Sequence, residues 1–400
     1  MKIGLISEYA DVFSGYAFSS EDLVDKGIPV LKIGNIQSGV VDKNCSSFYS
    51  EKINNKLKKY VLSQSDFLIA MTGAGSVGRA GIMIDCNDTF LVNQRVAIVR
   101  CKDSIDNKYF YYFFRLPFVE NYLYSLGIGA GQPNISSKDI LRIKSLFHEK
   151  KEREKVANVL FAYDKLIETN NKRIKVLEQM AEELYKEWFV RFRFPGYENT
   201  EFENGIPKGW EYIRADKVIY FNPTLKSNSQ QEFTIIPMEA LSTTSMVLDS
   251  SCFIRQATIT GKRSQNGDTL FAKITPCLEN GKTGFVMGLA EGEIAGGSTE
   301  FIVLRSKILT PHYVYCIARS YYFRQTAILS MNGADGRQRV DEGKLKSTKV
   351  LRPTKTVLDR FEKIVSPIFD IIFKLTQKNK VLTEQRDLLL PRLMSGKLEV

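Results

Sequence analysis

The length, composition and charge of the chain indicate a folded protein with more than one domain. Its 400 residues exceed what one hydrophobic core usually organises, and 44% hydrophobic with 25% charged residues argues against extensive disorder. The net charge of +11 favours an anionic partner, of which nucleic acid is the commonest large example. No apolar run approaches the roughly 18 residues of a membrane span, so we expect a soluble, cytoplasmic protein.

The cysteines and histidines suggest no metal or catalytic site. The six cysteines are scattered without a Cys-x-x-Cys pair, which favours neither zinc nor a disulfide framework. Neither His148 nor His312 has a nucleophile or a second ligand at a suitable spacing. We therefore expect that this chain holds no metal and no cofactor of its own.

Residues 1–147 are predicted to form a strand-rich first domain. Short apolar or alternating runs are typical of strands, and they occur at 28–33, 67–71, 81–84 and 95–99. Residues 109–118 favour a helix, because Tyr109, Tyr112, Phe113 and Leu116 share one face. A loop rich in glycine and amide side chains follows at 127–136 (GIGAGQPNIS).

A long helix is predicted from about residue 149 to 194, where apolar residues recur at alternating spacings of four and three. This spacing forms a seam along which one helix packs against another, and it recurs 205 positions later. The seam residues of interest are Val156, Leu160, Ile167, Ile174, Leu177, Leu184 and Trp188 in the first helix, and Phe361, Val365, Ile372, Leu382 and Leu389 in the second.

Polar residues and a proline interrupt these seams. Asn170 and Asn379 fix the register of the helices if they are buried; the alternative is that both face water at a local irregularity. Pro367 is expected to kink the second helix or to mark the start of its packed part, because proline removes a backbone hydrogen bond.

The second half of the chain repeats the first in the same order, which indicates an internal duplication. Residues 65–70 match 267–272, residues 96–100 match 301–305, and the loop at 131–135 matches 336–340. The predicted layout is a first domain at 1–147, a long helix at 148–194, a connector at 195–208, a second domain at 209–353 and a second long helix at 354–400.

We therefore expect an α+β fold with two strand-rich domains in tandem, each followed by a long helix. The first helix leads to the second domain and the second must return if the seams are to meet, so the pair is predicted to be an antiparallel coiled coil with pseudo-twofold symmetry. The 32 residues from Val156 to Trp188 span about 48 Å at roughly 1.5 Å per residue. This length exceeds one DNA turn of about 34 Å.

Signatures of enzymes are weak in this sequence. Residues 275–283 end like a phosphate-binding loop, but Pro276 replaces the opening glycine and removes an N–H from the anion cradle. Residues 222–224 are similar to the start of an amino-methyltransferase catalytic loop, yet they lack its second proline and its aromatic residue. No dinucleotide-binding helix follows the glycine-rich run at 72–79, so a turn between strands is its alternative reading.

Two pairs of matched loops carry groups that suit DNA. Residues 72–79 and 275–282 combine flexible backbone with Arg or Lys, which suits phosphate, while amide and guanidinium groups at 132–134 and 337–339 suit adenine and guanine edges. A capped surface turn is the alternative for each single residue. The candidate DNA-binding residues are Thr72, Arg79, Gln94, Arg95, Gln132, Asn134, Arg263, Lys273, Asn280, Lys282, Arg337, Gln338 and Arg339.

Several segments across the chain carry a resemblance to a known family, and they lie at 27–30, 34–36, 131–136, 177–178, 185–189, 205–210, 236–241, 275–283 and 385–396. In this order they resemble the specificity subunit of type I restriction-modification enzymes. The first half departs from the pattern because it lacks the Pro-x-Gly-Trp opening found at 207–210. We therefore expect a slightly short first recognition domain.

This resemblance implies a non-catalytic chain whose two target recognition domains each read part of a split duplex sequence in the major groove. The paired helices of such proteins act as a spacer and as a docking surface for two methylation subunits, which bring S-adenosylmethionine. Motor-nuclease subunits that use ATP and magnesium join the assembly. Two alternatives remain open: a self-contained DNA modification enzyme with drifted motifs, and a coiled-coil scaffold whose globular ends bind protein.

Overall fold

The computed structural model of the protein describes residues 1–37, 39–50, 52–63, 66–84, 88–129, 131–225, 232–334 and 336–400. These residues form two compact units. Unit 1 comprises Met1–Thr169 with Asn379–Val400, and unit 2 comprises Asn170–Lys378. Ser65, Cys86 and Ala130, which entered the sequence comparisons, lie outside the described residues.

Unit 1 is built on two sheets and a short strand pair. The larger sheet has the order β2 (Ala10–Ser14), β11 (Val96–Cys101), β8 (Phe67–Ala70), β9 (Ala80–Ile82), β6 (Gly39–Val41) and β5 (Ile36–Gln37). The smaller has the order β10 (Leu91–Val92), β4 (Ile28–Leu31), β7 (Phe48–Tyr49) and β3 (Leu23–Val24). β1 (Lys2–Leu5) pairs antiparallel with β12 (Lys144–Phe147), and the short helices are α1 (Ile6–Tyr9), α2 (Asp106–Phe114), α3 (Pro117–Gly127) and α4 (Ser137–Leu141).

Unit 2 has the same kind of construction. One sheet has the order β16 (Ile219–Phe221), β22 (Phe301–Ser306), β19 (Thr269–Ala272) and β20 (Thr283–Phe285), and another has β18 (Ile254–Gln256), β17 (Phe233–Ile236) and β21 (Gly296–Gly297). The paired strands are β13 (Phe202–Glu203) with β14 (Ile206–Pro207) and β15 (Glu211–Arg214) with β23 (Lys349–Arg352). The short helices are α6 (Ala215–Val218), α7 (Pro311–Arg319), α8 (Tyr321–Leu329) and α9 (Glu342–Ser347).

The elements of the two units confirm the internal repeat. The elements β4, β11, α2 and β12 have counterparts in β17, β22, α7 and β23 whose bounds lie 205 positions later. The strand pair β1–β12 of unit 1 is likewise repeated by β15–β23 in unit 2. The first domain therefore has the same closing strand pair as the second, although its sequence lacks the Pro-x-Gly-Trp opening.

The buried strands and helices follow from continuous apolar runs. All residues of β8 are buried, as is typical of a strand covered on both faces. The helix predicted at 109–118 is instead two helices, α2 and α3, because Leu116 precedes Pro117 and adopts an extended backbone. The rings of α2 from Tyr109 to Phe114 are all buried, so this helix is covered all round rather than on one face.

The two long helices are α5 (Lys150–Tyr185), which a π-helical turn extends to Val190, and α10 (Lys355–Met394). The first helix was expected to continue to Phe194, but Phe192 has a φ of 58°, outside the helical range. Phe194 instead packs against Trp210, with ring centroids 4.9 Å apart. None of the described helices combines the length and the apolar character that a membrane crossing requires.

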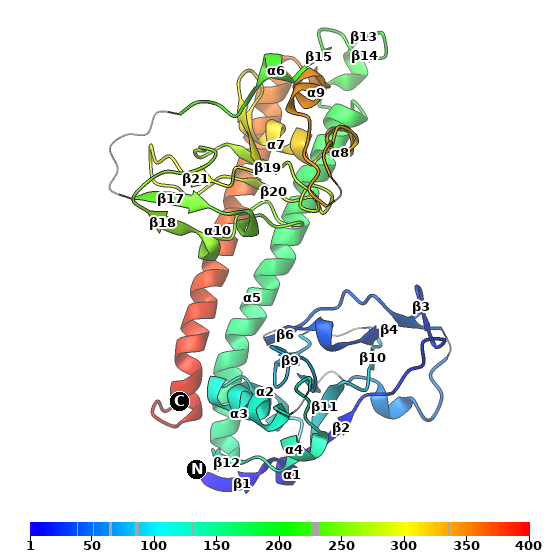
Figure 1. The fold of residues 1–400 in the computed structure, drawn as a ribbon, viewed down its shortest axis with the longest axis vertical. Helices are drawn as coiled ribbons and strands as arrows, with labels where there is room; N and C mark the ends of the chain where they lie inside the picture. The colour runs from blue at the N-terminus through cyan, green and yellow to red at the C-terminus, as the bar shows by residue number, and fades with distance from the viewer. Residues whose placement is uncertain are drawn as a thin grey trace. The chain divides into compact units, whose positions relative to one another are not determined.

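The long helices pack antiparallel within each unit, as predicted. In unit 1 the beginning of α5 shares a core with the end of α10, through Val156 and Leu160 with Leu390 and Leu393, and α2 and α3 lie beside the same part of α5 (Figure 1). In unit 2 the end of α5 meets the beginning of α10, where the rings of Trp188 and Phe361 are 5.8 Å apart.

The structure decides between some of the alternatives left open for the seams. Asn170 is only 3% exposed, so it does not face water; Asn379 is half-buried, and both residues have interaction partners. Pro367 does not begin the packed part of α10, because Phe361 and Val365 precede it and are fully buried. α10 continues through this proline as one helix.

Candidate nucleic-acid interface

In unit 1, backbone hydrogen bonds join the loop after β8 to the loop before α4. Gly73 N donates to Pro133 O (3.1 Å), and Ile135 N donates to Met71 O (2.9 Å). Thr72 lies between these bonds and pairs with Asn134. Met71 N also donates to the carbonyl oxygen of Arg95 (3.0 Å), which attaches the segment before β11. We call this set of bonds the loop frame.

Unit 2 has the same loop frame. Thr275 N donates to Gln338 O (3.1 Å), and Val340 N donates to Lys273 O (2.9 Å). Ile274 pairs with Arg339, and Lys273 N donates to the carbonyl oxygen of Glu300 (3.0 Å). The backbone around both sites is therefore conserved between the units, while the side chains on it differ.

The loop frame corrects one detail of the predicted alignment. Ala70 N donates to Arg79 O and Ala272 N donates to Lys282 O, which confirms that Arg79 and Lys282 are counterparts. At the other end of the loop, however, the counterpart of Thr72 is Ile274 rather than Thr275. The loop in unit 2 is one residue longer, which a comparison at one constant offset cannot reveal.

In unit 1 the loop frame borders a cavity of about 510 Å³ that brings together Thr72, Gln94, Arg95, Gln132 and Asn134. Its remaining lining residues are Ser14, Met71, Pro133, Ile135 and Ser136. Among the described residues, nothing pairs with Thr72 Oγ1 or Gln94 Oε1, although both atoms are buried. A buried polar atom without a partner costs about 1–3 kcal/mol, so this cavity favours a ligand with complementary polar groups.

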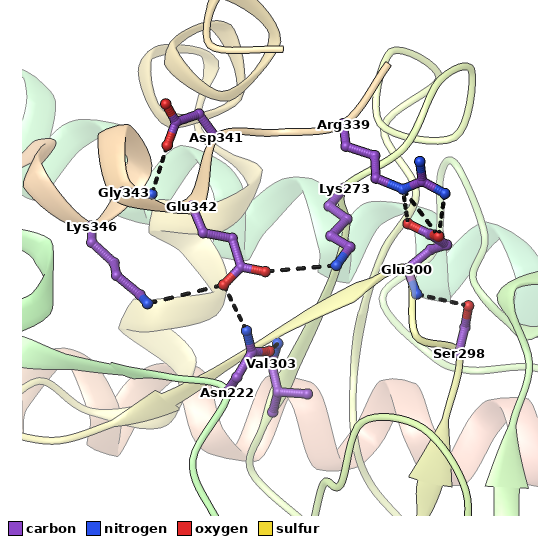
Figure 2. Close-up of polar contacts among 10 residues, drawn as sticks. All are labelled: Asn222, Lys273, Ser298, Glu300, Val303, Arg339, Asp341, Glu342, Gly343 and Lys346. Carbon is purple, nitrogen blue, oxygen red and sulfur yellow. Dashed lines mark hydrogen bonds and ion pairs between the residues drawn. The ribbon is translucent and has the colours of Figure 1, made fainter. Parts of the chain in front are cut away.

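In unit 2 the corresponding positions carry paired charges. Arg339 Nε donates to Glu300 Oε2 (2.9 Å) and Arg339 Nη2 donates to Glu300 Oε1 (2.7 Å). Figure 2 shows this pair beside a second one, in which Lys273 Nζ lies 3.7 Å from Glu342 Oε1. The hydrogen bond from Arg339 lowers the pKa of Glu300 below its ordinary value, which keeps the carboxylate ionised.

Asn222 has a structural role beside these pairs. Its Nδ2 donates to Glu342 Oε2 (2.9 Å), and its Oδ1 accepts from Val303 N (3.0 Å), as Figure 2 shows. Both ends of the amide are thus engaged in joining β16, β22 and α9. This arrangement gives no support to the similarity of residues 222–224 to a methyltransferase loop.

The other predicted residues occupy several environments. Arg79 donates to Gly75 O of its own loop, whereas Lys282 Nζ donates to Met238 O on a different segment (3.1 Å). Arg263 donates to Leu225 O and lines a smaller cavity of about 210 Å³ in unit 2. Asn280 and Arg337 face solvent, whereas Gln338 is half-buried.

Sequence reasoning missed Glu300 and Glu342, the carboxylates that hold Arg339 and Lys273. Glu300 could have been found from the sequence, because the 205-residue offset makes it the equivalent of Arg95, which was a candidate. Within the part of the chain that the structure describes, no group of three or more His, Cys, Asp or Glu side chains could hold a metal ion. His148 instead bonds through Nδ1 to the Tyr109 hydroxyl (2.9 Å).

Known proteins resemble this chain in sequence and in fold. Residues 2–179 match the family model described as the type I restriction modification DNA specificity domain. The type I restriction enzyme MjaIX specificity subunit of Methanocaldococcus jannaschii is 25% identical over 347 residues, which cover 83% of this chain and 78% of that protein. The EcoAI specificity subunit of Escherichia coli is 30% identical over 198 residues, 46% of this chain and 33% of that protein.

A solved structure extends the likeness to the whole fold. The type I restriction-modification S subunit from M. genitalium has a TM-score of 0.59 at 16% identity, and the match covers 98% of this chain and 96% of that one. At this identity the likeness concerns the fold alone, and it includes both units.

Proposed function

We infer that this chain, which belongs to the family of type I restriction-modification specificity subunits, reads a split duplex DNA sequence and carries no catalytic group itself. The observation that carries the proposal is the repeated loop frame. Its backbone is the same in both units, yet Thr72, Arg95 and Asn134 in unit 1 are replaced by Ile274, Glu300 and Arg339 in unit 2.

A repeated frame with different side chains suits two readers of different sequences. Amide groups such as those of Gln94 and Asn134 can bond bidentately to adenine, and a guanidinium such as that of Arg339 to guanine. Contacts to phosphate carry no sequence information and only position the protein. We therefore assign base reading to the frame side chains and phosphate contact to the exposed Arg337.

The partner subunits are part of the same proposal. In unit 2, Val176 and Met180 of α5 are exposed apolar side chains, and in unit 1 so are Val381 and Leu388 of α10. Exposed apolar side chains gathered on a helix mark protein contact surfaces, and methylation subunits are the partners that we propose for them. S-adenosylmethionine, ATP and magnesium would then be held by methylation and motor-nuclease subunits, in the cytoplasm where the DNA lies.

Footprinting of duplex DNA with the chain and its methylation subunits tests this function. Two separated protected patches are expected, and a single contiguous patch would contradict it. The affinity should also fall steeply with salt, because several phosphates are neutralised; a scaffold that binds only protein would show no such DNA binding.

A second assay separates a reader from a self-contained enzyme. The chain alone should transfer no methyl group to DNA, and transfer should appear once the methylation subunits are added. Transfer by the purified chain alone would show that it carries the catalytic groups itself.

A further inference from the structure

We propose that Glu300 is a positioning residue that fixes the guanidinium of Arg339 for bidentate recognition of one guanine in the second part of the DNA target. This inference rests on the proposed function and concerns unit 2 alone.

The geometry of the pair leaves the recognition edge of Arg339 free. Glu300 takes up Nε and Nη2, which lie along one edge of the planar guanidinium. The other edge keeps one N–H on Nη1 beside one on Nη2, and this fork matches the O6 and N7 acceptors of guanine in the major groove. The Arg339 side chain is 50% exposed, so that edge is open to a ligand.

The backbone on both sides of the pair is itself held. Arg339 N donates to Asn332 O (2.9 Å), and the backbone of Arg339 forms a β-bridge with Ile274 in the loop frame. Glu300 directly precedes β22; its backbone N donates to Ser298 Oγ (3.2 Å), and its carbonyl oxygen accepts from Lys273 N (3.0 Å). An arginine held in this way loses little further rotamer freedom when it binds.

The equivalent pair in unit 1 excludes the same mode of reading there. Arg95 occupies the frame position of Glu300, and Asn134 occupies that of Arg339. Unit 1 thus presents an amide without a supporting carboxylate at this position. A guanine contact of this type is expected in one part of the target only.

The test uses the full chain assembled with its methylation subunits, on the target found by sequencing methylated DNA. Binding of wild type and Glu300→Gln is compared on three duplexes: the target, the target with one second-part G·C pair replaced, and an unrelated sequence. Glu300→Gln should bind the target about tenfold more weakly and lose preference for that G·C pair. Its binding to the unrelated duplex should stay equal or strengthen, because a negative charge is removed.

Two variants serve as controls. Arg339→Lys keeps the positive charge but loses the forked pair of N–H donors. It should weaken the preference for the same G·C pair. Glu279→Gln makes the same charge change on the neighbouring loop. The exposed Glu279 carboxylate forms no hydrogen bond or ion pair with the described residues, so this variant should affect all duplexes equally.

The outcomes separate this inference from the proposed function. An equal change on all three duplexes for Glu300→Gln, or relaxation of a different base pair from Arg339→Lys, would overturn the positioning role. Tighter binding of both variants to the substituted target than to the unrelated duplex shows that the chain is folded. Failure of the wild-type complex to prefer any duplex would overturn the proposed function instead.

Discussion

At equivalent positions between α5 and α10, the two units use side chains of different chemical type. In unit 1, Asp164 of α5 and Arg386 of α10 form a buried ion pair. In unit 2 the residues at the same 205-residue offset are Phe369 and Ala181, and both are buried in the apolar core. A charged pair and a large–small apolar pair therefore fill the same place in a repeated frame.

The loops show the same principle as the helices. The backbone hydrogen bonds of the loop frame recur at nearly equal lengths in both units. The side chains on it change from Thr72, Arg95 and Asn134 in unit 1 to Ile274 and the Arg339–Glu300 ion pair in unit 2. Duplication thus preserved the backbone frame of each unit, while side chains diverged both in the buried helix contacts and on the loops. The variants below test how far this division holds.

The largest effect is expected at the buried ion pair. Arg386→Ala leaves Asp164 with the Tyr112 hydroxyl and with Arg115 Nη1 at 3.6 Å. Removing one partner of a buried pair should lower the free energy of unfolding by about 3–5 kcal/mol, measured by chemical denaturation. Adding Asp164→Phe, which copies the pair of unit 2, should recover part of this loss; a further loss would show that the two pairs are not interchangeable.

A smaller and equal effect is expected at the ion pairs that both units share. Asp66 accepts from Arg100 and from Ser63 N, and Asp268 accepts from Arg305 and from Gln265 N in the same way. Asp66→Asn and Asp268→Asn should each lower the free energy of unfolding by about 1.5–3 kcal/mol, again measured by denaturation. A lower free energy of unfolding in only one of the two variants would show that the two ion pairs are not structurally equivalent.

Thr72→Val should change binding more than stability. Its buried hydroxyl has no partner among the described residues, and Ile274 occupies this position in unit 2. The free energy of unfolding should stay equal or rise by about 1 kcal/mol. Titration of target DNA should nevertheless show weaker binding by about 1 kcal/mol if the hydroxyl meets a base, and unchanged binding would exclude that contact.

The smallest effect is a pH dependence that belongs to unit 1. Burial lowers the pKa of His148 below 6.5, so the folded state holds it neutral while the unfolded state takes up a proton more readily. Its contribution to stability is present above about pH 6.5 and is lost as the pH falls below that value. Thermal unfolding at pH 7 and pH 5 should show a larger decline for the wild type than for His148→Asn, and an equal decline would contradict this.

Much of the fold could be predicted because its signals are long and repeated. The seams of α5 and α10 and the constant offset between the halves identify the helices, their antiparallel pairing and the repeated order of strands. The end of the helical segment at Val190 could not be predicted. It is followed by the left-handed backbone of Phe192 and by the packing of Phe194 against Trp210, a residue of another segment. Local pattern does not contain that tertiary contact.

The sequence predicted which loops form the candidate site, but not which side chains pair with one another there. Gln94, Gln132 and Asn134 do line one cavity in unit 1. The carboxylates that hold Arg339 and Lys273 lie on other segments, and only folding brings them together. Residue type can therefore indicate a suitable group, but its partner and orientation require the structure.

The central claim is that one chain holds two separate readers, and sequencing of methylated sites tests it most directly. DNA is exposed to complexes that contain the wild type, Asn134→Ala or Arg339→Ala. The wild type should mark two specified blocks separated by unspecified bases, with Asn134→Ala relaxing one block and Arg339→Ala the other. One uninterrupted block, or relaxation of the same block by both variants, would contradict the account.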